Sequence, residues 1–261
     1  MGRLDDKVCI VTGAGSGIGA KTAEIFAQEG AKVVMADMRE DALNAVAEKI
    51  RAEGGDVMTA VVNITDEQNV QSAVDAAVEK YGKIDALANI AGILDVEMRP
   101  IDDFLTKDVE ATLNVNVKGT LFITRAVVQQ FVKQGFGNVA TVASVGGLTG
   151  NGSAAYTVSK GAEIAMTKHI AFRFANGKQN IRANCICPGT VMTPMTNAAM
   201  KARVNYTTAA KQMQTSMMKH TTLDVGACTD EDIAKVLLFL CSDDSACING
   251  QAIVTDYGAN L

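Results

Sequence analysis

The sequence contains very little histidine, proline or aromatic residue. Of its 261 residues two are histidine, three are proline, none is tryptophan, and only 5% are aromatic. With His169 and His220 as its only histidines, the chain offers no basis for a Ser-His-Asp triad. Cys185 and Cys187 have neither a second cysteine pair nor a nearby histidine, so we expect no metal site.

Charge and hydrophobic length exclude further classes. The chain carries 24 basic and 29 acidic residues, a formal net charge of −5, which gives no electrostatic footprint for a nucleic acid. No run approaches about 18 apolar residues, and the first residues lack the pattern of a signal peptide. The six cysteines lie mostly within apolar runs, where a reducing compartment would keep them as thiols. We therefore expect a cytoplasmic protein with no membrane or nucleic-acid partner.

Short β-branched runs alternate with longer stretches of helical periodicity. The predicted strands are residues 8–11, 32–36, 57–62, 84–89, 138–142, 181–186 and 251–255. The predicted helices are residues 18–28, 40–52, 67–81, 104–133, 154–175 and 230–241. This alternation predicts an α/β protein with a seven-stranded parallel sheet, doubly wound (Rossmann) with helices on both faces. Neither an internal repeat nor a low-complexity linker divides the chain, so residues 1–261 are predicted to form a single domain.

Residues 190–229 do not fit the alternation. This stretch follows the sixth predicted strand and holds six of the twelve methionines. Long insertions at the carboxyl end of a strand often cover substrates, and methionine suits a surface that adapts to a bulky apolar ligand. We predict a substrate lid here; the alternative is a pair of methionine-rich helices that fills the core.

A glycine-rich turn joins the first predicted strand to the first predicted helix. Glycine permits positive φ and close approach of a pyrophosphate, and the start of the helix offers free N–H groups. Such a cluster is a weak signal alone and a strong one between a strand and a helix, although a flexible turn is the alternative. The residues predicted to bind the cofactor here are Gly13, Ser16, Gly17, Ile18 and Gly19.

Asp37 ends the second predicted strand, eighteen residues after Gly19. A carboxylate at this place would accept hydrogen bonds from the adenosine ribose and repel a 2′-phosphate, so it favours NAD over NADP. Position 16 is a serine, not a basic residue, which agrees, whereas Arg39 could bind the phosphate of NADP. The alternative role for Asp37 is to cap the turn.

Tyr156 and Lys160 lie four residues apart at the start of a predicted helix and so share one face. Ser144 ends the fifth predicted strand twelve residues before Tyr156. With the glycine-rich turn, this order resembles the short-chain dehydrogenase/reductase family in its single-domain form, over nearly the whole chain. Further matching segments are Asn89-Ile90-Ala91-Gly92, Val115-Asn116-Val117-Lys118-Gly119 and Pro188-Gly189-Thr190-Val191-Met192-Thr193-Pro194.

The resemblance implies catalytic roles for four residues. Tyr156 would be the general acid in ketone reduction and the base in alcohol oxidation, with its phenolate stabilised by the ammonium of Lys160. Ser144 would polarise the substrate oxygen. Asn116 would free a helix carbonyl to hold a water that relays protons from Lys160. The alternatives are a structural Asn116 with satisfied hydrogen bonds and an exposed Tyr156–Lys160 pair without function.

The resemblance also implies further contacts with the cofactor and a homotetramer. Lys160 would hold the nicotinamide ribose beside Tyr156, and Asn63 stands where relatives usually place an aspartate against the adenine. The remaining predicted cofactor-binding residues are Ile64, Asn89, Ala91, Gly92, Pro188, Gly189, Val191 and Thr193.

These observations predict an NAD-dependent enzyme that interconverts a secondary alcohol and a ketone, with a large apolar small molecule as its substrate. The methionine-rich lid favours a hydroxysteroid, including a bile acid. The alternatives are a 3-oxoacyl-thioester reductase, against which Asp37 and Ser16 argue, and a polyol dehydrogenase, for which the chain has few stacking aromatics. An NAD-binding sensor or scaffold without chemistry is the alternative from another class.

Overall fold

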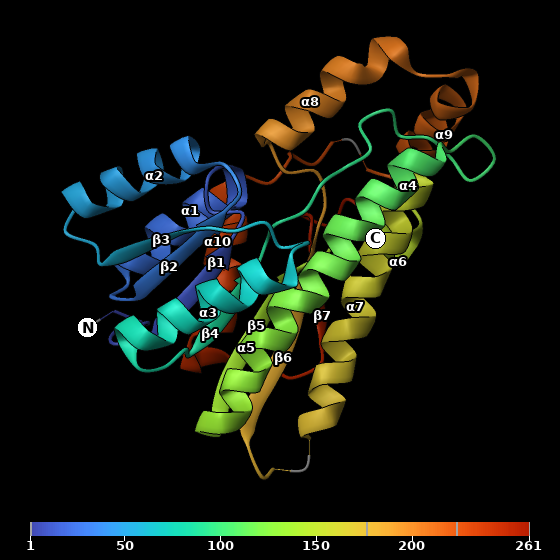
Figure 1. The fold of residues 1–261 in the computed structure, drawn as a ribbon. Coiled ribbons are helices and arrows are strands. Elements are labelled where there is room, and N and C mark those ends of the chain that lie inside the picture. Colours follow the sequence, from blue (N-terminus) through green and yellow to red (C-terminus); the bar gives the residue numbers. More distant parts are fainter. Residues whose placement is uncertain (1, 176, 223, 261) are drawn as a thin grey trace.

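The computed structural model describes residues 2–175, 177–222 and 224–260, in which seven parallel strands form one sheet (Figure 1). Their order across the sheet is β3-β2-β1-β4-β5-β6-β7. The strands are β1 (Val8–Thr12), β2 (Lys32–Asp37), β3 (Val57–Val61), β4 (Ala86–Asn89), β5 (Phe136–Val142), β6 (Asn180–Pro188) and β7 (Ala252–Thr255). The predicted doubly wound sheet is confirmed, and its strand order reverses between β1 and β4.

Helices cover both faces of this sheet. On one face lie α1 (Gly17–Gln28), α2 (Glu40–Ala52) and α10 (Asp230–Cys241), with Phe26 fully buried among them. On the other lie α3 (Glu67–Tyr81), α5 (Thr120–Gln134) and α7 (Ala154–Phe174), with Phe131 fully buried. Because both faces are covered, the central strands are continuous apolar runs, and all five residues of β1 are buried.

The sequence also marks where these helices begin and end. The side chain of Asp66 accepts hydrogen bonds from two backbone N–H groups at the start of α3, and Gly82 ends that helix in the left-handed region. Ser153 caps α7 through the backbone N–H of Tyr156. Thr229 and Asp232 form a reciprocal capping box at α10. The predicted bounds of these helices therefore agree closely with the observed ones.

The helix predicted over residues 104–133 is present over residues 106–134, but it is not a single α-helix. The segment instead contains α4 (Thr106–Leu113), a π-helical stretch η1 (Asn114–Gly119) and then α5. Apolar periodicity continues through all three, so it could not show the change in winding. The physical reason lies in Asn116, whose buried side chain is hydrogen bonded in both directions to the backbone of Ile93. Such π-helical turns are frequent at functional sites.

The methionine-rich insertion forms two helices beyond the carboxyl edge of the sheet, α8 (Pro194–Ala202) and α9 (Thr208–Lys219), joined through η2 (Arg203–Asn205) (Figure 1). No residue of α8 is buried, and in α9 only Ala210 is. The alternative in which these helices fill the core is therefore wrong. Two further short elements are α6 (Gly146–Thr149) and η3 (Asp243–Ser245).

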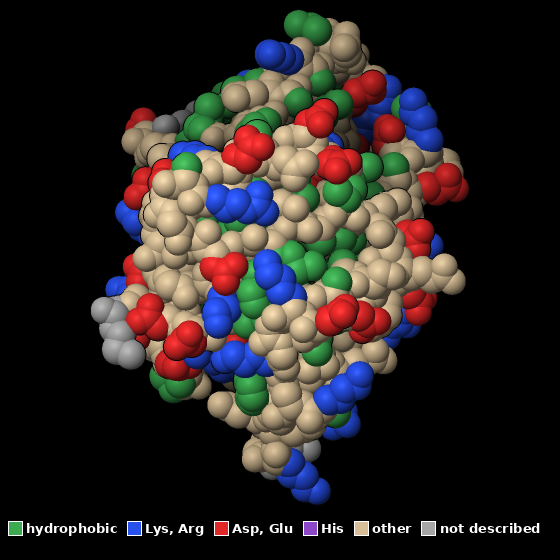
Figure 2. Space-filling view, turned by 60° about the vertical axis from the view of Figure 1, so that its left-hand side comes forward, with side chains coloured by type: hydrophobic (Ala, Val, Ile, Leu, Met, Phe, Trp, Pro, Cys, Tyr) green, Lys and Arg blue, Asp and Glu red, His purple; other side chains and the backbone are tan. Residues whose placement is uncertain are grey.

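Acidic and basic side chains alternate on the face shown in Figure 2, with hydrophobic side chains between them. None of the described helices combines the length and apolar character needed to cross a membrane. Among the described residues, no group of three or more His, Cys, Asp or Glu side chains is arranged to hold a metal ion.

Candidate active site

The parallel sheet collects the predicted site residues at one edge. Asp37 and Asn89 are the last residues of β2 and β4, Pro188 is the last of β6, and Ser144 lies two residues beyond the end of β5. Since the carboxyl ends of parallel strands meet at the same edge, residues far apart in the sequence come together there. The edge faces α8 and α9.

The glycine-rich turn has the geometry of an anion-binding loop. Gly13 and Gly17 have φ values of +68° and +54°, which L side chains rarely adopt. Ser16 precedes α1 without a side-chain capping bond, and the first turn of α1 contains no acidic residue. The N–H groups at the start of α1 are therefore left for a ligand, and the loop fits the pyrophosphate of a dinucleotide.

Replacing Gly19 by alanine is expected to abolish binding of the dinucleotide. A Cβ at this position would lie 2.1 Å from the carbonyl oxygen of Gly13, so the loop backbone must move. Quenching or enhancement of NADH fluorescence on titration measures the affinity. Thermal unfolding of the same variant identifies the trivial outcome, a global loss of fold, and unchanged NADH affinity would contradict the assignment of the loop.

Asp37 is buried and lies against this loop. Its Oδ2 accepts a hydrogen bond from the backbone N–H of Gly15 at 2.9 Å, and its Oδ1 accepts one from that of Arg39 at 2.9 Å. The guanidinium of Arg39 bends back, with Nε 3.4 Å from Oδ1 of Asp37 and Nη2 2.8 Å from Oγ of Ser16. The carboxylate is thus fixed at the end of β2 with an arginine beside it.

Asn63, which is predicted to contact the adenine, already has hydrogen-bond partners within the protein. The amide oxygen of Asn63 accepts hydrogen bonds from the backbone N–H and hydroxyl of Thr65, at 3.1 and 2.9 Å, and so closes a local turn. Ile64 is buried and packs in the core. The adenine contact of Asn63 therefore stays a prediction. It requires the amide oxygen of Asn63 to accept a hydrogen bond from the adenine in addition to those from Thr65.

The segment after β4 is fixed to β1 by a threonine. The hydroxyl of Thr12 accepts hydrogen bonds from the backbone N–H groups of Ile90 and Ala91, at 2.9 and 3.1 Å. The next residue, Gly92, has no side chain, and a Cβ there would lie 3.2 Å from Oδ1 of Asn116 and 3.6 Å from Nζ of Lys160. Asn89 is buried and donates to the hydroxyl of Thr124 at 2.7 Å.

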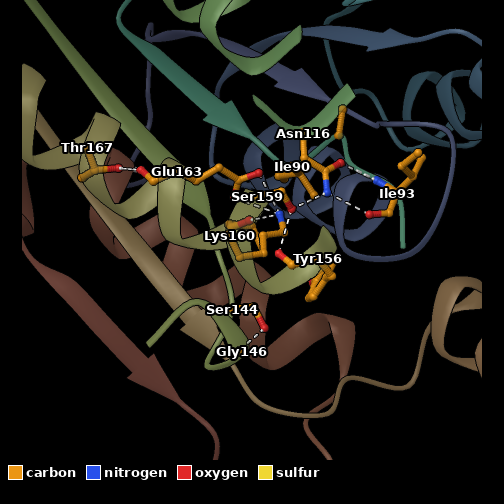
Figure 3. Close-up of polar contacts among 12 residues, drawn as sticks. Ile90, Ile93, Asn116, Ser144, Gly146, Tyr156, Ser159, Lys160, Glu163 and Thr167 are labelled. Carbon is orange, nitrogen blue, oxygen red and sulfur yellow. Dashed lines mark hydrogen bonds and ion pairs between the residues drawn. The ribbon is translucent and has the colours of Figure 1, made fainter. Parts of the chain in front are cut away.

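Three of the four predicted catalytic residues lie around one buried hydrogen-bond chain (Figure 3). Asn116 donates from Nδ2 to the carbonyl of Ile93 and to Oγ of Ser159, at 2.9 and 3.0 Å. Ser159 in turn donates to the carbonyl of Tyr156 at 2.8 Å. Asn116 is therefore not free on a helix surface but ties η1 to the first two turns of α7, which carry Tyr156 and Lys160.

Ser144 and Tyr156 both line the same cavity. The backbone N–H of Gly146 donates to Oγ of Ser144 at 3.1 Å, which orients this hydroxyl. Tyr156 enters the cavity from α7, with Gly152 close enough that a Cβ there would lie 3.6 Å from its ring. Two hydroxyl-bearing side chains from different elements therefore face one cavity.

Lys160 is buried, and its partner Glu163 was not predicted from the sequence. Its Nζ donates to the carbonyl of Val142 at 2.8 Å and lies 2.9 Å from each oxygen of Glu163, which is also buried. Burial lowers the pKa of Lys160, but the field of Glu163 and the Tyr156 hydroxyl raise it more, so the pKa is raised overall. Burial also raises the pKa of Glu163. The spacing of three residues on one helix face was the available signal.

The segment after β6 brings the last predicted residues to the loop. Thr193 caps α8, and a Cβ on Gly17 would touch its side chain at 3.5 Å. Gly189 packs against Asp256, where a Cβ would lie 2.7 Å from that side chain. Val191 is buried and forms a bridge with Cys228. Thr193 thus lies against the glycine-rich turn, whereas Gly189 and Val191, which follow Pro188 at the end of β6, line the cavity.

The cavity has a volume of about 450 Å³ and is mainly apolar. Its methionines are Met98, Met195, Met200, Met217 and Met218. Polar groups come from Asn151 in the loop before α7, from Arg203 in η2 and from Gln214 in α9. Four of these methionines lie in the insertion for which the sequence predicted a lid, whereas Met98 and the three polar residues were not anticipated, because only the folded chain brings them to Ser144 and Tyr156.

Comparison with known proteins places this geometry in a family. A sequence model described as enoyl-(acyl carrier protein) reductase matches residues 13–260. The chain belongs to the short-chain dehydrogenase/reductase family. This dehydrogenase/reductase is therefore an NAD(P)-dependent oxidoreductase that acts on CH–OH donors.

Its relatives differ in substrate. It is 38% identical to a 3-oxoacyl-[acyl-carrier-protein] reductase of Thermotoga maritima, over 98% of both chains. It is 35% identical to a 3β-hydroxysteroid dehydrogenase of Eggerthella lenta, over 98% of this chain and 95% of the relative. A solved 7α-hydroxysteroid dehydrogenase, complexed with NADH and 7-oxo glycochenodeoxycholic acid, superposes with a TM-score of 0.83 and 32% identity, over 99% of this chain and 96% of the other.

Proposed function

We propose that this enzyme is an NAD-dependent dehydrogenase for the secondary hydroxyl of an apolar polycyclic alcohol, most specifically a hydroxysteroid of the bile-acid class. The observation that carries the proposal is the cavity, which has Ser144 and Tyr156 on its wall and a methionine-lined cover made by α8 and α9. Methionine side chains adapt to a rigid apolar surface without a fixed shape of their own.

The chain's own residues provide acid–base catalysis and orientation. When bound, the nicotinamide cofactor accepts the hydride in oxidation or supplies it in reduction. Tyr156 takes the proton of the substrate hydroxyl in oxidation and returns it in reduction. Ser144 donates a hydrogen bond to the substrate oxygen where negative charge develops. The ammonium of Lys160 lies 5.7 Å from the centroid of the Tyr156 ring and stabilises the phenolate by its field.

The proposed preference for NAD rests on Asp37. A buried carboxylate at the end of β2 accepts hydrogen bonds from ribose hydroxyls and repels a 2′-phosphate. Arg39 lies beside it, but its guanidinium is already engaged with Asp37 and Ser16. The loop, Thr193 and Lys160 would hold the rest of the dinucleotide.

Arg203 supports a substrate with an anionic end. It lines the cavity from η2, and among the described residues it forms no ion pair with a carboxylate. Its Nε lies 3.0 Å from the side-chain oxygen of Gln214 once that amide is oriented to accept. An apolar ring system with a carboxylate tail would place its rings against the methionines and its tail against this guanidinium.

Replacing Arg203 by alanine is expected to raise KM about tenfold for a carboxylate-bearing hydroxysteroid, because a charge-assisted hydrogen bond contributes roughly 1.5–3 kcal/mol. The kcat should change little, since this contact is the same in the ground and transition states. A neutral hydroxysteroid should show no change in KM. Lys201→Ala, at an exposed residue of α8, is the matched control. Equal effects on charged and neutral steroids would contradict the role of Arg203.

A 3-oxoacyl-thioester reductase is the second candidate, favoured by the 38% identity to the Thermotoga maritima enzyme. A panel of steroid alcohols, polyols and 3-hydroxyacyl thioesters, assayed by NADH formation, decides between them. A kcat/KM highest for a steroid supports the proposal, and one highest for the thioester rejects it.

A further inference from the structure

Glu163 is the one buried carboxylate in contact with a predicted catalytic side chain among the described residues. Its side chain is 3% exposed, and that of Lys160 is 5% exposed. Both lie on α7 one turn apart, and Figure 3 shows Lys160 between Glu163 and Tyr156. The reaction proposed above assigns nothing to Glu163. A buried carboxylate is costly to keep without a purpose or a partner.

The ammonium of Lys160 makes three hydrogen-bond contacts within the protein. One reaches the carbonyl of Val142 at the end of β5, and the other two reach the two oxygens of Glu163. A lysine side chain has four flexible carbons, so two anchors on different elements are what fix the position of its Nζ. Of these two contacts, the one with Glu163 also brings a negative charge next to the ammonium.

We propose that Glu163 is a positioning residue that keeps Lys160 in its ammonium form and holds that ammonium toward Tyr156. This inference rests on the proposed function, because it matters for catalysis only if Tyr156 exchanges a proton with the substrate. Burial alone favours the neutral amine, which would not stabilise a phenolate. The carboxylate reverses this preference and so keeps the ammonium available over the working pH range.

Few other groups act on this pair. From β6 the thiols of Cys185 and Cys187 face the same region, and Cys187 acts on Lys160. The strand β5 and the helix α6 contribute no titratable side chain. Among the residues that the structure describes, Lys160 is the charged group that lowers the pKa of Glu163. The titratable residues on the remaining packed elements, α4 and η1, are Lys107, Asp108, Glu110 and Lys118, and none is hydrogen bonded to Glu163.

The decisive variant is Glu163→Gln, which keeps the shape and an acceptor oxygen but removes the charge. We expect the Lys160 side chain to lose its proton about one to three pH units lower than in the wild type. The Cε resonance of Lys160 in ¹³C-lysine-labelled, cofactor-free protein reports this titration directly, assigned through its loss in Lys160→Ala. The alkaline fall of kcat/KM for alcohol oxidation should move to lower pH by the same amount.

Two further variants separate charge from structure. Glu163→Asp keeps a carboxylate one methylene shorter, so it should restore most of the wild-type midpoint and serves if the glutamine variant does not fold. Glu110→Gln, on the exposed surface of α4, should leave both measurements unchanged. A Lys160 midpoint that is the same in wild type and Glu163→Gln overturns the proposal, as does lower activity without a moved alkaline limb. Because the resonance is measured without substrate, its shift stands even if the wild type oxidises no alcohol, which would reject the proposed function instead.

Discussion

Turnover of the secondary alcohol is expected to fall by about 10²–10⁴-fold when Tyr156 is replaced by phenylalanine. The substitution keeps the ring in the cavity and removes only the hydroxyl that takes the proton. A hydroxide or water could accept the proton in its place, but neither is oriented by α7 nor stabilised by the ammonium of Lys160. The change should therefore appear in kcat at every pH where the wild type is active.

Binding of NAD should survive this substitution, because the glycine-rich turn and Asp37 are untouched. Fluorescence titration with NADH measures the affinity, and Tyr81→Phe is the matched control. Tyr81 hydrogen bonds Asp56 at 2.9 Å, and neither residue lines the cavity. Full activity in Tyr156→Phe would reject acid–base catalysis by Tyr156. An NAD-binding sensor without chemistry would instead show no turnover in the wild type and unchanged binding in the variant.

The sheet could be predicted from the sequence because its strands are buried on both faces. A continuous apolar run such as Val8–Thr12 predicts a strand buried on both faces of a sheet. The intervening helices must then cover both faces of that sheet. The grouping of Ser144, Tyr156 and Lys160 could likewise be predicted, because Tyr156 and Lys160 share a helix face and Ser144 lies just after the preceding strand. Once the strands are known to be parallel, the residues that follow their carboxyl ends are expected at the same edge of the sheet.

The rest of the site depends on contacts between distant segments, which periodicity does not record. The π-helical turn η1 forms because Asn116 bonds to Ile93, twenty-three residues away. Arg203 reaches the cavity only because the insertion folds over the carboxyl edge. Glu163 differs, since its distance from Lys160 is local; what the sequence could not give is that both side chains are buried.

Replacing Asp37 by asparagine is expected to lower the ratio of kcat/KM for NAD to that for NADP by about 100-fold. Asparagine keeps the shape and an acceptor for Gly15 but loses the charge that strengthens hydrogen bonds to the ribose by roughly 1–2 kcal/mol. Removing that charge also removes repulsion of the 2′-phosphate. Arg39, released from its contact with Asp37, becomes free to bind the same phosphate.

The double variant Asp37→Asn with Arg39→Ala separates these two contributions. If Arg39 supplies the gain with NADP, the double variant loses that gain but keeps the weakened binding of NAD. Asp41→Ala, at an exposed acidic residue in the first turn of α2, is the control for a general change in charge near the loop. A ratio unchanged in Asp37→Asn would mean that the carboxylate serves only to fix Gly15 and Arg39, and that the choice of dinucleotide is made elsewhere in the site.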